Sequence, residues 1–170
     1  EKEKEKEKEG VNRELPLAMQ YRNMKANPPK VQFLRSGIHG WGVFTPDGIR
    51  AGEMIMEYVG EVIRMSVADA REKHYDSRGI GCYMFRLDTD SIVDATMKGG
   101  LARFINHSCS PNAFTRPITI DKHTKKIVII ALKDIPPGCE VAYDYHFAIE
   151  DDSEKIECLC GAPNCKGFMN

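Results

Sequence analysis

Residues 104–112 read FINHSCSPN and place an amide, an imidazole, a hydroxyl and a thiol side by side, at Asn106, His107, Ser108 and Cys109. Such a cluster can be a surface turn, a nucleophile with its base, or parts of two different sites. Covalent catalysis is disfavoured, because residues two apart in a loop point in different directions and no acidic residue nearby would orient His107. Ser108 also lacks the G-x-S-x-G context of a strained nucleophile elbow.

The placement of the cysteines indicates a metal site. None of the six precedes Cys82, and three fall within residues 158–165 as C-x-C-x₄-C, whereas a disulfide framework usually spreads through a small secreted chain. A reduced compartment and a metal are therefore expected, with a disulfide plus spare thiols as the alternative. Structural zinc takes four ligands, so a fourth must come from elsewhere in the chain.

Cys109 is the best candidate for this fourth ligand. Cys82 and Cys139 lie in or beside predicted strands, where a free cysteine behaves as a small hydrophobic residue. Cys109 instead lies in a polar loop before a proline. The predicted zinc ligands are Cys109, Cys158, Cys160 and Cys165, a set that would fasten the C-terminal tail over the loop containing Asn106 and His107.

Length and composition are typical of a globular protein. The chain has 170 residues, 42% hydrophobic and 29% charged, which is enough for one domain with a sizeable core. A formal net charge of −1 disfavours binding to nucleic acid through phosphate neutralisation. The longest apolar run, residues 127–132, is too short to span a bilayer, and no signal peptide opens the chain. We expect no membrane association. Residues 1–14 begin with alternating Glu and Lys and are predicted to be a charged, flexible lead-in.

Short β-like runs dominate the sequence after residue 31. A weak helical pattern over residues 15–25 comes first and ends at the breaker Asn27-Pro28-Pro29. One further helix is predicted over about 66–78, with Ser66 and Asp69 resembling a capping box, Val67, Ala70, His74 and Tyr75 sharing a face, and Gly79 ending it. Strands and helices do not alternate, so a mostly-β domain is favoured over a doubly wound sheet. The predicted strand segments are VQFL (31–34), WGVF (41–44), MIMEYVGEVI (54–63), CYMFRL (82–87), SIVDA (91–95), FTRPITI (114–120) and KIVIIAL (126–132).

Two further motifs carry weaker signals when they are taken alone. The turn His39-Gly40-Trp41-Gly42 is not a dinucleotide-binding motif, yet its glycines let backbone lie close to a ligand; such a motif is more often just a tight turn. In EVAYDYHF (140–147), Tyr143 and Tyr145 share one face of an extended segment, which is more often a half-buried strand than a functional site.

Taken together and in this order, the motifs resemble those of the SET-domain protein lysine methyltransferases that carry a zinc-binding post-SET segment. The resemblance covers residues 31–170 and rests on HGWG (39–42), GCYMFR (81–86), RFINHSCSPN (103–112), EVAYDY (140–145) and CLCGAPNC (158–165). GIGCYMFR (79–86), DATMKGGLARFINHSC (94–109), FAIED (147–151) and the final FMN are similar to the trithorax or mixed-lineage-leukaemia (COMPASS) type. Trp41 departs from the residues expected between the two glycines.

This resemblance implies a mostly-β fold of the SET-domain β-clip type, with several small sheets, a knot-like C-terminal threading and a zinc-bound post-SET tail. It also implies a division of the chain. The expected parts are the lead-in 1–14, an N-flanking segment 15–30, the SET domain 31–148 with its insert helix at about 66–78, and the post-SET zinc segment 149–170.

The resemblance further implies two sites on opposite faces. S-adenosylmethionine is expected in a pocket lined by His39, Gly40, Trp41, Gly42, Tyr83, Asn106, His107 and Leu159. A target lysine is expected to enter a narrow channel formed by the catalytic tyrosines Tyr58, Tyr143 and Tyr145. Tyr145 matches the tyrosine that orients the reacting groups, and Tyr143 matches the position that limits how many methyl groups fit.

The implied activity is histone lysine N-methylation, directed to lysine 4 of histone H3, with S-adenosylhomocysteine as the cofactor product. Alternatives are a SET enzyme for another histone lysine and a catalytically silent module that binds a histone tail or partners. The absence of a cysteine before Cys82 disfavours the lysine 9 and lysine 36 groups. The expected partners are the H3 N-terminal tail and COMPASS-type scaffold subunits of the WD-repeat and SPRY-domain kinds, and the expected location is the nucleus. Direct nucleic-acid binding is not expected.

Overall fold

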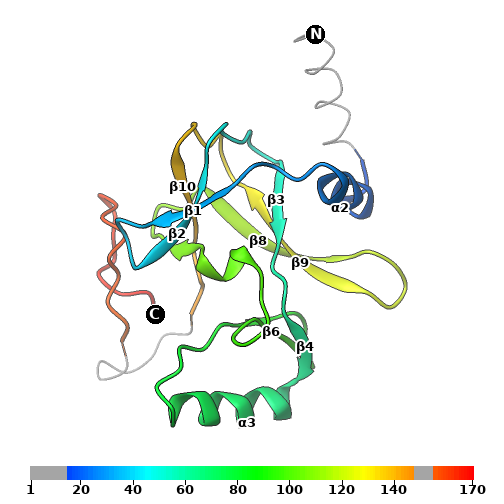
Figure 1. Ribbon diagram of the computed structural model, residues 1–170, viewed down its shortest axis with the longest axis vertical. Helices are drawn as coiled ribbons and strands as arrows, with labels where there is room; N and C mark the ends of the chain where they lie inside the picture. Colours follow the sequence, from blue (N-terminus) through cyan, green and yellow to red (C-terminus); the bar gives the residue numbers. More distant parts are fainter. Residues whose placement is uncertain (1–14, 148–154) are drawn as a thin grey trace.

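The structure is a computed structural model that describes residues 15–147 and 155–170. The predicted lead-in 1–14 and the start of the predicted post-SET segment lie outside the described residues. Within them the protein is mostly β, with several small sheets and few helices, as the sequence predicts (Figure 1). No helix of the described part is both long enough and apolar enough to cross a lipid bilayer.

A four-stranded sheet in the order β1-β2-β10-β7 joins segments from both halves of the chain. β1 and β2 form a hairpin, and the distant β10 pairs with the other edge of β2. β10 then pairs in parallel with the short β7, so the end of the domain lies next to its middle. The bounds are β1 Gln32–Arg35, β2 Trp41–Thr45, β7 Asn106–His107 and β10 Cys139–Tyr143.

A second sheet, in the order β3-β9-β8, carries much of the core. β9 is buried from Ile127 to Ala131, because β3 and β8 flank it on both edges and other elements cover its faces. Strands buried on both faces read as continuous apolar runs rather than alternating ones. The bounds are β3 Met54–Glu57, β8 Ala113–Thr119 and β9 Lys125–Ala131.

Helix α2 (Leu17–Ala26) lies against this second sheet, with Met24 packed into a core cluster that includes Ile118 and Val128. The Tyr21 hydroxyl donates to Glu57 at 2.8 Å. The helix ends where the sequence predicts, because Pro28 and Pro29 follow and disfavour helical backbone before them.

A third sheet, in the order β4-β6-β5, is formed by β4 (Glu61–Arg64), β6 (Ser91–Asp94) and β5 (Met84–Arg86). The sequence suggested one strand over residues 54–63, but β3 and β4 belong to different sheets. The break falls at Gly60, where a Cβ would lie 2.6 Å from the carbonyl oxygen of Asp94. The close approach of β6 therefore requires glycine at this turn.

Helix α3 (Met65–Asp76) follows β4 directly and differs from the predicted helix at both ends (Figure 1). Its N-cap is Arg64, with no side-chain cap, so the predicted capping box of Ser66 and Asp69 is wrong. Of the predicted face only Tyr75 is buried; Val67, Ala70 and His74 are exposed, and Ala68, which was not predicted, is the other buried residue of the helix. The reason is tertiary, because the register of α3 is set by its packing on β4 and β6.

Candidate functional site

The pairing of β7 with β10 brings the motif 104–112 beside the tyrosine-rich segment. Asn106 lies opposite Ala142, and His107 lies opposite Tyr143. The Asn112 side chain reinforces this pairing, because its Nδ2 donates to the Glu140 carbonyl at 2.7 Å and its Oδ1 accepts from the Ala142 N–H at 2.9 Å. An asparagine amide can act as donor and acceptor at once. The motif 104–112 is thus held against β10 in two ways, by the pairing of β7 with β10 and by the two hydrogen bonds of the Asn112 side chain.

A first cavity of about 640 Å³ lies between the β1–β2 turn, β7 and the C-terminal tail. Every residue that the sequence predicted to hold a cofactor lines it, except Gly42; they are His39, Gly40, Trp41, Tyr83, Asn106, His107 and Leu159. Gly42 lies instead in β2, where a Cβ would overlap the carboxylate of Glu140. Its role is close packing beneath the cavity.

A polar network that the sequence did not predict supports the Asn106 side chain. Asn106 is 8% exposed, and its Nδ2 lies 2.7 Å from Glu140 Oε1, 3.0 Å from Ser36 Oγ and 3.0 Å from the carbonyl oxygen of Trp41. Since the amide nitrogen faces these acceptors, its carbonyl oxygen is the atom that it can offer to a bound amine. Nothing in the local sequence separates Ser36 and Glu140 from ordinary surface residues.

His107 connects the cysteine loop to the tyrosines. Its Nδ1 accepts a hydrogen bond from the backbone N–H of Tyr145 at 3.2 Å, and its Nε2 lies 3.6 Å from Cys109 Sγ. Burial lowers the pKa of His107 and outweighs the nearby carboxylate of Asp144. The ring is therefore neutral, with its proton on Nε2 and directed at the sulfur.

A second cavity of about 460 Å³ is lined by the tyrosines predicted to be catalytic, Tyr58, Tyr143 and Tyr145. The ring centroids of Tyr143 and Tyr145 are 5.0 Å apart. The Tyr145 hydroxyl donates to the Ile105 carbonyl at 2.8 Å, which fixes the direction of its proton. Burial is the main cause that raises the pKa of each of these tyrosines far above the ordinary value, so their hydroxyls stay protonated at neutral pH.

One wall separates the two cavities, and four residues line both of them: Cys82, Tyr83, Arg103 and Tyr145. The Arg103 guanidinium carbon lies 4.3 Å from the Tyr83 ring centroid, within the range of a cation–π contact. Arg103 and Cys82 were not predicted as site residues. Cys82 was expected to pack as a small hydrophobic residue in or beside a strand, but β5 begins only at Met84, and Cys82 as a whole residue is exposed.

The thiols of the predicted zinc set lie together at the edge of the first cavity. The sulfur atoms of Cys109, Cys158, Cys160 and Cys165 all lie within 4.8 Å of one another. Cys109 and Cys158 are 3.7 Å apart, close to the roughly 3.8 Å that tetrahedral Zn–S bonds of about 2.3 Å would give. Cys158 itself lines the first cavity, and so does Leu159, which lies between Cys158 and Cys160 in the chain.

A family profile described as "SET domain" matches residues 40–146, which is more than half of the chain. The chain belongs to the SET-domain family. The two cavities and the wall between them lie within or beside the matched range.

Relatives of this SET domain are named as histone-lysine N-methyltransferases. Human "Histone-lysine N-methyltransferase 2B" is 54% identical over 158 residues, which is 92% of this chain and 6% of the relative. Trithorax of Drosophila virilis is 50% identical over 95% of the chain and 4% of its own length. The "H3 lysine-4 specific" enzyme of Saccharomyces cerevisiae is 52% identical over 95% of the chain and 15% of its own length. The chain thus spans a small part of each relative's length. Its similarity to these proteins identifies it as a SET domain of the trithorax type.

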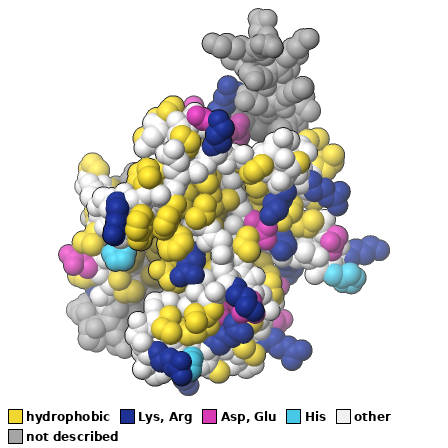
Figure 2. All heavy atoms as spheres, in the orientation of Figure 1, with side chains coloured by type: hydrophobic (Ala, Val, Ile, Leu, Met, Phe, Trp, Pro, Cys, Tyr) yellow, Lys and Arg dark blue, Asp and Glu magenta, His cyan; other side chains and the backbone are white. Residues whose placement is uncertain are grey.

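Hydrophobic side chains border the SET domain's first cavity from outside. Trp41 is 41% exposed, stacks on Phe33 with centroids 4.7 Å apart, and has Arg35 above its ring at 4.2 Å. Figure 2 shows hydrophobic side chains across the middle of this face, over β1 and β2, with Lys and Arg side chains toward the β8–β9 hairpin.

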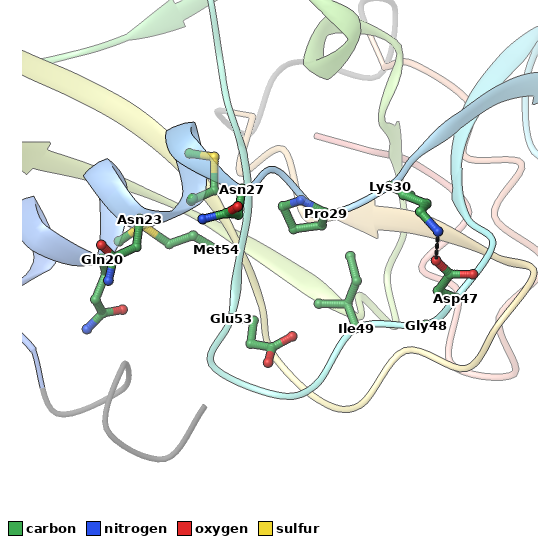
Figure 3. A pocket seen from close by; sticks show the side chains of 11 residues that line it. Gln20, Asn23, Asn27, Pro29, Lys30, Asp47, Gly48, Ile49, Glu53 and Met54 are labelled. Carbon is green, nitrogen blue, oxygen red and sulfur yellow. Dashed lines mark ion pairs between the residues drawn. The ribbon is translucent and has the colours of Figure 1, made fainter. Parts of the chain in front are cut away.

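A further cavity of about 520 Å³ lies between α2 and the segment after β2, and none of the predicted site residues lines it (Figure 3). Lys30 and Asp47 form an ion pair at 3.0 Å at one end of it, and the side chains of Gln20 and Asn23 extend from α2 at the other. Its lining residues include no tyrosine, cysteine or histidine. The residues predicted for the cofactor and for catalysis line the other two cavities instead.

Proposed function

We propose that this chain is the catalytic part of an S-adenosylmethionine-dependent histone lysine N-methyltransferase that acts on lysine 4 of histone H3. The observation that carries this proposal is the wall of Tyr83, Arg103 and Tyr145 shared by two cavities, one suited to the cofactor and one to a lysine side chain. Because the same side chains line both cavities, the cavities adjoin, and a methyl group can be transferred where the two bound molecules meet between these side chains.

The first cavity fits the cofactor in size and chemistry. A volume of about 640 Å³ is within the range of about 300–1,000 Å³ that is common for small-molecule sites. Trp41 and Leu159 supply apolar surface for an adenine ring. Asn106 is assigned to the methionine amine through its carbonyl oxygen, and Tyr83 is assigned to the methionine carboxylate. Gly40, at φ +48°, turns the backbone of the β1–β2 loop along the site.

The second cavity fits a lysine side chain in its neutral form. Tyr58 and Tyr143 are each 5% exposed, and their rings would surround the aliphatic stem and exclude water. The residues that line this cavity include Arg86 and Arg103 but no carboxylate. Burial and neighbouring positive charge both lower the pKa of an amine, so the ammonium loses its proton to water before it is seated. No dedicated base is required.

Tyr145 is assigned the alignment of the reaction. Bound S-adenosylmethionine supplies an electrophilic methyl group on a positively charged sulfur. The Tyr145 hydroxyl donates a hydrogen bond to the carbonyl oxygen of Ile105. The lone pairs of the hydroxyl oxygen can then accept a hydrogen bond from an N–H of the lysine amine. The amine lone pair then points toward the first cavity, where the methyl group would lie. Such alignment is the main contribution that an enzyme can make to an in-line displacement.

The four clustered thiols are assigned to one structural zinc ion. Thiolate sulfur is its usual ligand, and a closed set of four leaves no open position for catalysis. The ion would hold Leu159 against the first cavity, because the ligands Cys158 and Cys160 flank it.

The remaining parts of the proposal concern the organisation of the chain and its partners. We place the N-flanking segment at residues 15–30, the SET domain at 31–148 and the post-SET segment at 149–170. The H3 tail is proposed as the substrate, because relatives are named for lysine 4 of H3. Association with COMPASS-type WD-repeat and SPRY-domain subunits, and a nuclear location, are proposed from the trithorax-type similarity.

The test is transfer of labelled methyl groups from S-adenosylmethionine to H3 peptides by the zinc-loaded chain, with and without scaffold subunits. We expect incorporation into an N-terminal H3 peptide, and its loss when lysine 4 is replaced by arginine. Equal labelling of the arginine peptide, or labelling only of peptides around lysine 9 or 36, would contradict the assigned target. No labelling of any peptide would leave a binding module as the better description.

A further inference from the structure

A half-buried carboxylate, that of Glu140 in β10, lies beneath the first cavity without a cationic partner. Its two oxygens accept from the Ser36 hydroxyl at 2.8 and 2.9 Å, and Oε1 also accepts from Asn106 Nδ2 at 2.7 Å. Both of these donors are neutral. In the part of the chain that the structure describes, no lysine, arginine or histidine forms an ion pair with this carboxylate. No charge of the protein therefore balances the charge of Glu140 at close range.

The β1–β2 turn holds this carboxylate in place. Ser36 Oγ accepts from the backbone N–H of Ile38 at 2.8 Å and of His39 at 3.3 Å. Because the lone pairs of the hydroxyl oxygen are occupied in this way, its single proton is directed at Glu140. On the other side the carboxylate lies against the backbone of β2, where a Cβ at Gly42 would overlap it. Glu140 is thus confined between the turn and the strand.

The Asn106 amide connects the carboxylate to the cavity that Asn106 lines. Its Nδ2 faces four oxygen atoms: Glu140 Oε1, Ser36 Oγ, and the carbonyl oxygens of Trp41 at 3.0 Å and His39 at 3.3 Å. If the amide turned over, its Oδ1 would lie against a carboxylate and two carbonyl groups, and buried acceptors without a donor are costly. The amide therefore has one favourable orientation, in which Oδ1 points away from Glu140.

The negative charge of Glu140 also acts on a second residue of the first cavity. Burial is the largest cause that raises the pKa of Tyr145, and the nearness of Tyr83 and Glu140 adds to it. Tyr145 and Asn106 line the same cavity. An electric field that opposes a further negative charge in this cavity stabilises a positive one. The first cavity is therefore suited to a ligand that carries a cationic group beside Asn106.

We propose that Glu140 is a positioning residue and the counter-charge for the amine of bound S-adenosylmethionine, acting through Asn106. This inference rests on the proposed function, which assigns Asn106 Oδ1 to that amine. The amine is an ammonium group at neutral pH. Glu140 does not touch the ligand; it fixes the orientation of the amide and supplies the negative charge that a neutral amide lacks. Because the amine is remote from the methyl group, Glu140 contributes mainly to cofactor affinity and less to the transfer step.

The test is a thermodynamic cycle, measured by calorimetry on the zinc-loaded chain. The two ligands are S-adenosylhomocysteine and its analogue in which hydrogen replaces the amine, and the two chains are the unmodified one and Glu140→Gln. We expect the variant to lose about 5- to 20-fold in affinity for S-adenosylhomocysteine and to bind the analogue within about twofold of the unmodified chain. A purely structural role would weaken both ligands equally, so the cycle isolates the effect on the amine.

Three further variants sharpen the test. Glu140→Asp keeps the charge and is expected to retain part of the preference for the ligand with the amine. Ser36→Ala removes the hydroxyl that holds the carboxylate, and we expect a loss of about 2- to 5-fold for S-adenosylhomocysteine alone. Glu53→Gln is the matched control, because Glu53 is a half-buried carboxylate at the cavity beside α2. It is expected to leave both affinities within about twofold of those of the unmodified chain.

Kinetics on the H3 peptide give a second readout. For Glu140→Gln, the KM for S-adenosylmethionine is expected to rise by about the factor lost in affinity, with a smaller fall in kcat. Equal losses for the two ligands, or an unchanged affinity for S-adenosylhomocysteine, would overturn the inference. Should Glu140→Gln fail to fold, Ser36→Ala and Glu140→Asp decide the matter with the same ligands. If the unmodified chain binds S-adenosylhomocysteine but methylates no peptide, the proposed function fails, while the cycle still decides the role of Glu140. If it does not bind S-adenosylhomocysteine, both fail.

Discussion

His107 and Tyr145 are joined by a hydrogen bond of 3.2 Å, in which the backbone N–H of Tyr145 donates to the ring Nδ1 of His107. The other ring nitrogen lies 3.6 Å from Cys109 Sγ. One imidazole thus links a proposed zinc ligand to the backbone of the proposed aligning tyrosine. The post-SET cysteines therefore bear on both cavities, and not only on the one that they adjoin.

Removal of the metal tests this link. Cys165→Ser, or treatment with a strong zinc chelator, is expected to weaken S-adenosylhomocysteine binding by about tenfold or more, since losing an apolar contact of leucine size costs about 1.5 kcal/mol. The rate at saturating cofactor is expected to fall as well. Cys139→Ser is the matched control, because this half-buried thiol lies in β10 outside the cluster. Equal effects of the two variants would show that cofactor binding does not depend on a zinc ion at the four cysteines.

Tyr145→Phe is expected to lower the methylation rate by about 100-fold, the scale of misaligned reactants, with cofactor affinity nearly unchanged. The hydroxyl bonds only to Ile105 among the contacts described, so the loss of stability is expected to be about 1 kcal/mol. Single-turnover kinetics and thermal unfolding measure the two effects. A variant that keeps the full rate would exclude the aligning role.

Tyr143→Phe is expected to increase the share of di- and trimethylated product, because the phenol oxygen occupies space and can hold water in a tunnel where Tyr143 is 5% exposed. Mass spectrometry of the H3 peptide over a time course measures the distribution. Unchanged proportions at equal total turnover would show that Tyr143 does not limit the product.

The pH dependence follows from the buried tyrosines. Burial raises the pKa values of Tyr58, Tyr143 and Tyr145, so the folded state holds its hydroxyl protons more tightly than the unfolded state. Their contribution to stability is complete below the unfolded pKa of about 10 and is lost as the pH rises above it. Single-turnover rates should therefore show no decline from tyrosine ionisation below about pH 10. A tyrosinate absorbance that appears well below this pH in the folded chain would contradict the assignment.

Gly42→Ala tests the packing beneath the first cavity. An added Cβ would overlap the Glu140 carboxylate, and we expect a loss of stability of about 1–3 kcal/mol with weaker cofactor binding, because Glu140 also holds Asn106. Gly37→Ala is the control, since no atom lies within 4 Å of its added Cβ. Thermal unfolding and calorimetry compare the two, and similar values for both would show that the overlap is relieved without cost.

The local sequence pattern correctly predicted those helices and strands whose determining residues lie close together in the chain. The breaker at Asn27-Pro28-Pro29 correctly ended α2, and the apolar run of β9 was recognised as a strand. The run at 54–63 was predicted as one strand, but it forms two. Its division at Gly60 depends on the close approach of β6, which lies 34 residues further along the sequence. The capping box of α3 failed for a similar reason, since Arg64 passes directly from β4 into the helix.

By itself, the sequence determined the family, the four thiols that cluster and, with the exception of Gly42, predicted residues that do line the two cavities, because these reside in motifs whose residue types and spacing are specific. Only the tertiary structure decided which residues stand between the cavities and what supports them. Arg103, Ser36 and Glu140 have no distinctive local pattern. Their roles come from burial and from partners far away in the chain, such as Ser36 and the Glu140 carboxylate, which lie 104 residues apart in the sequence.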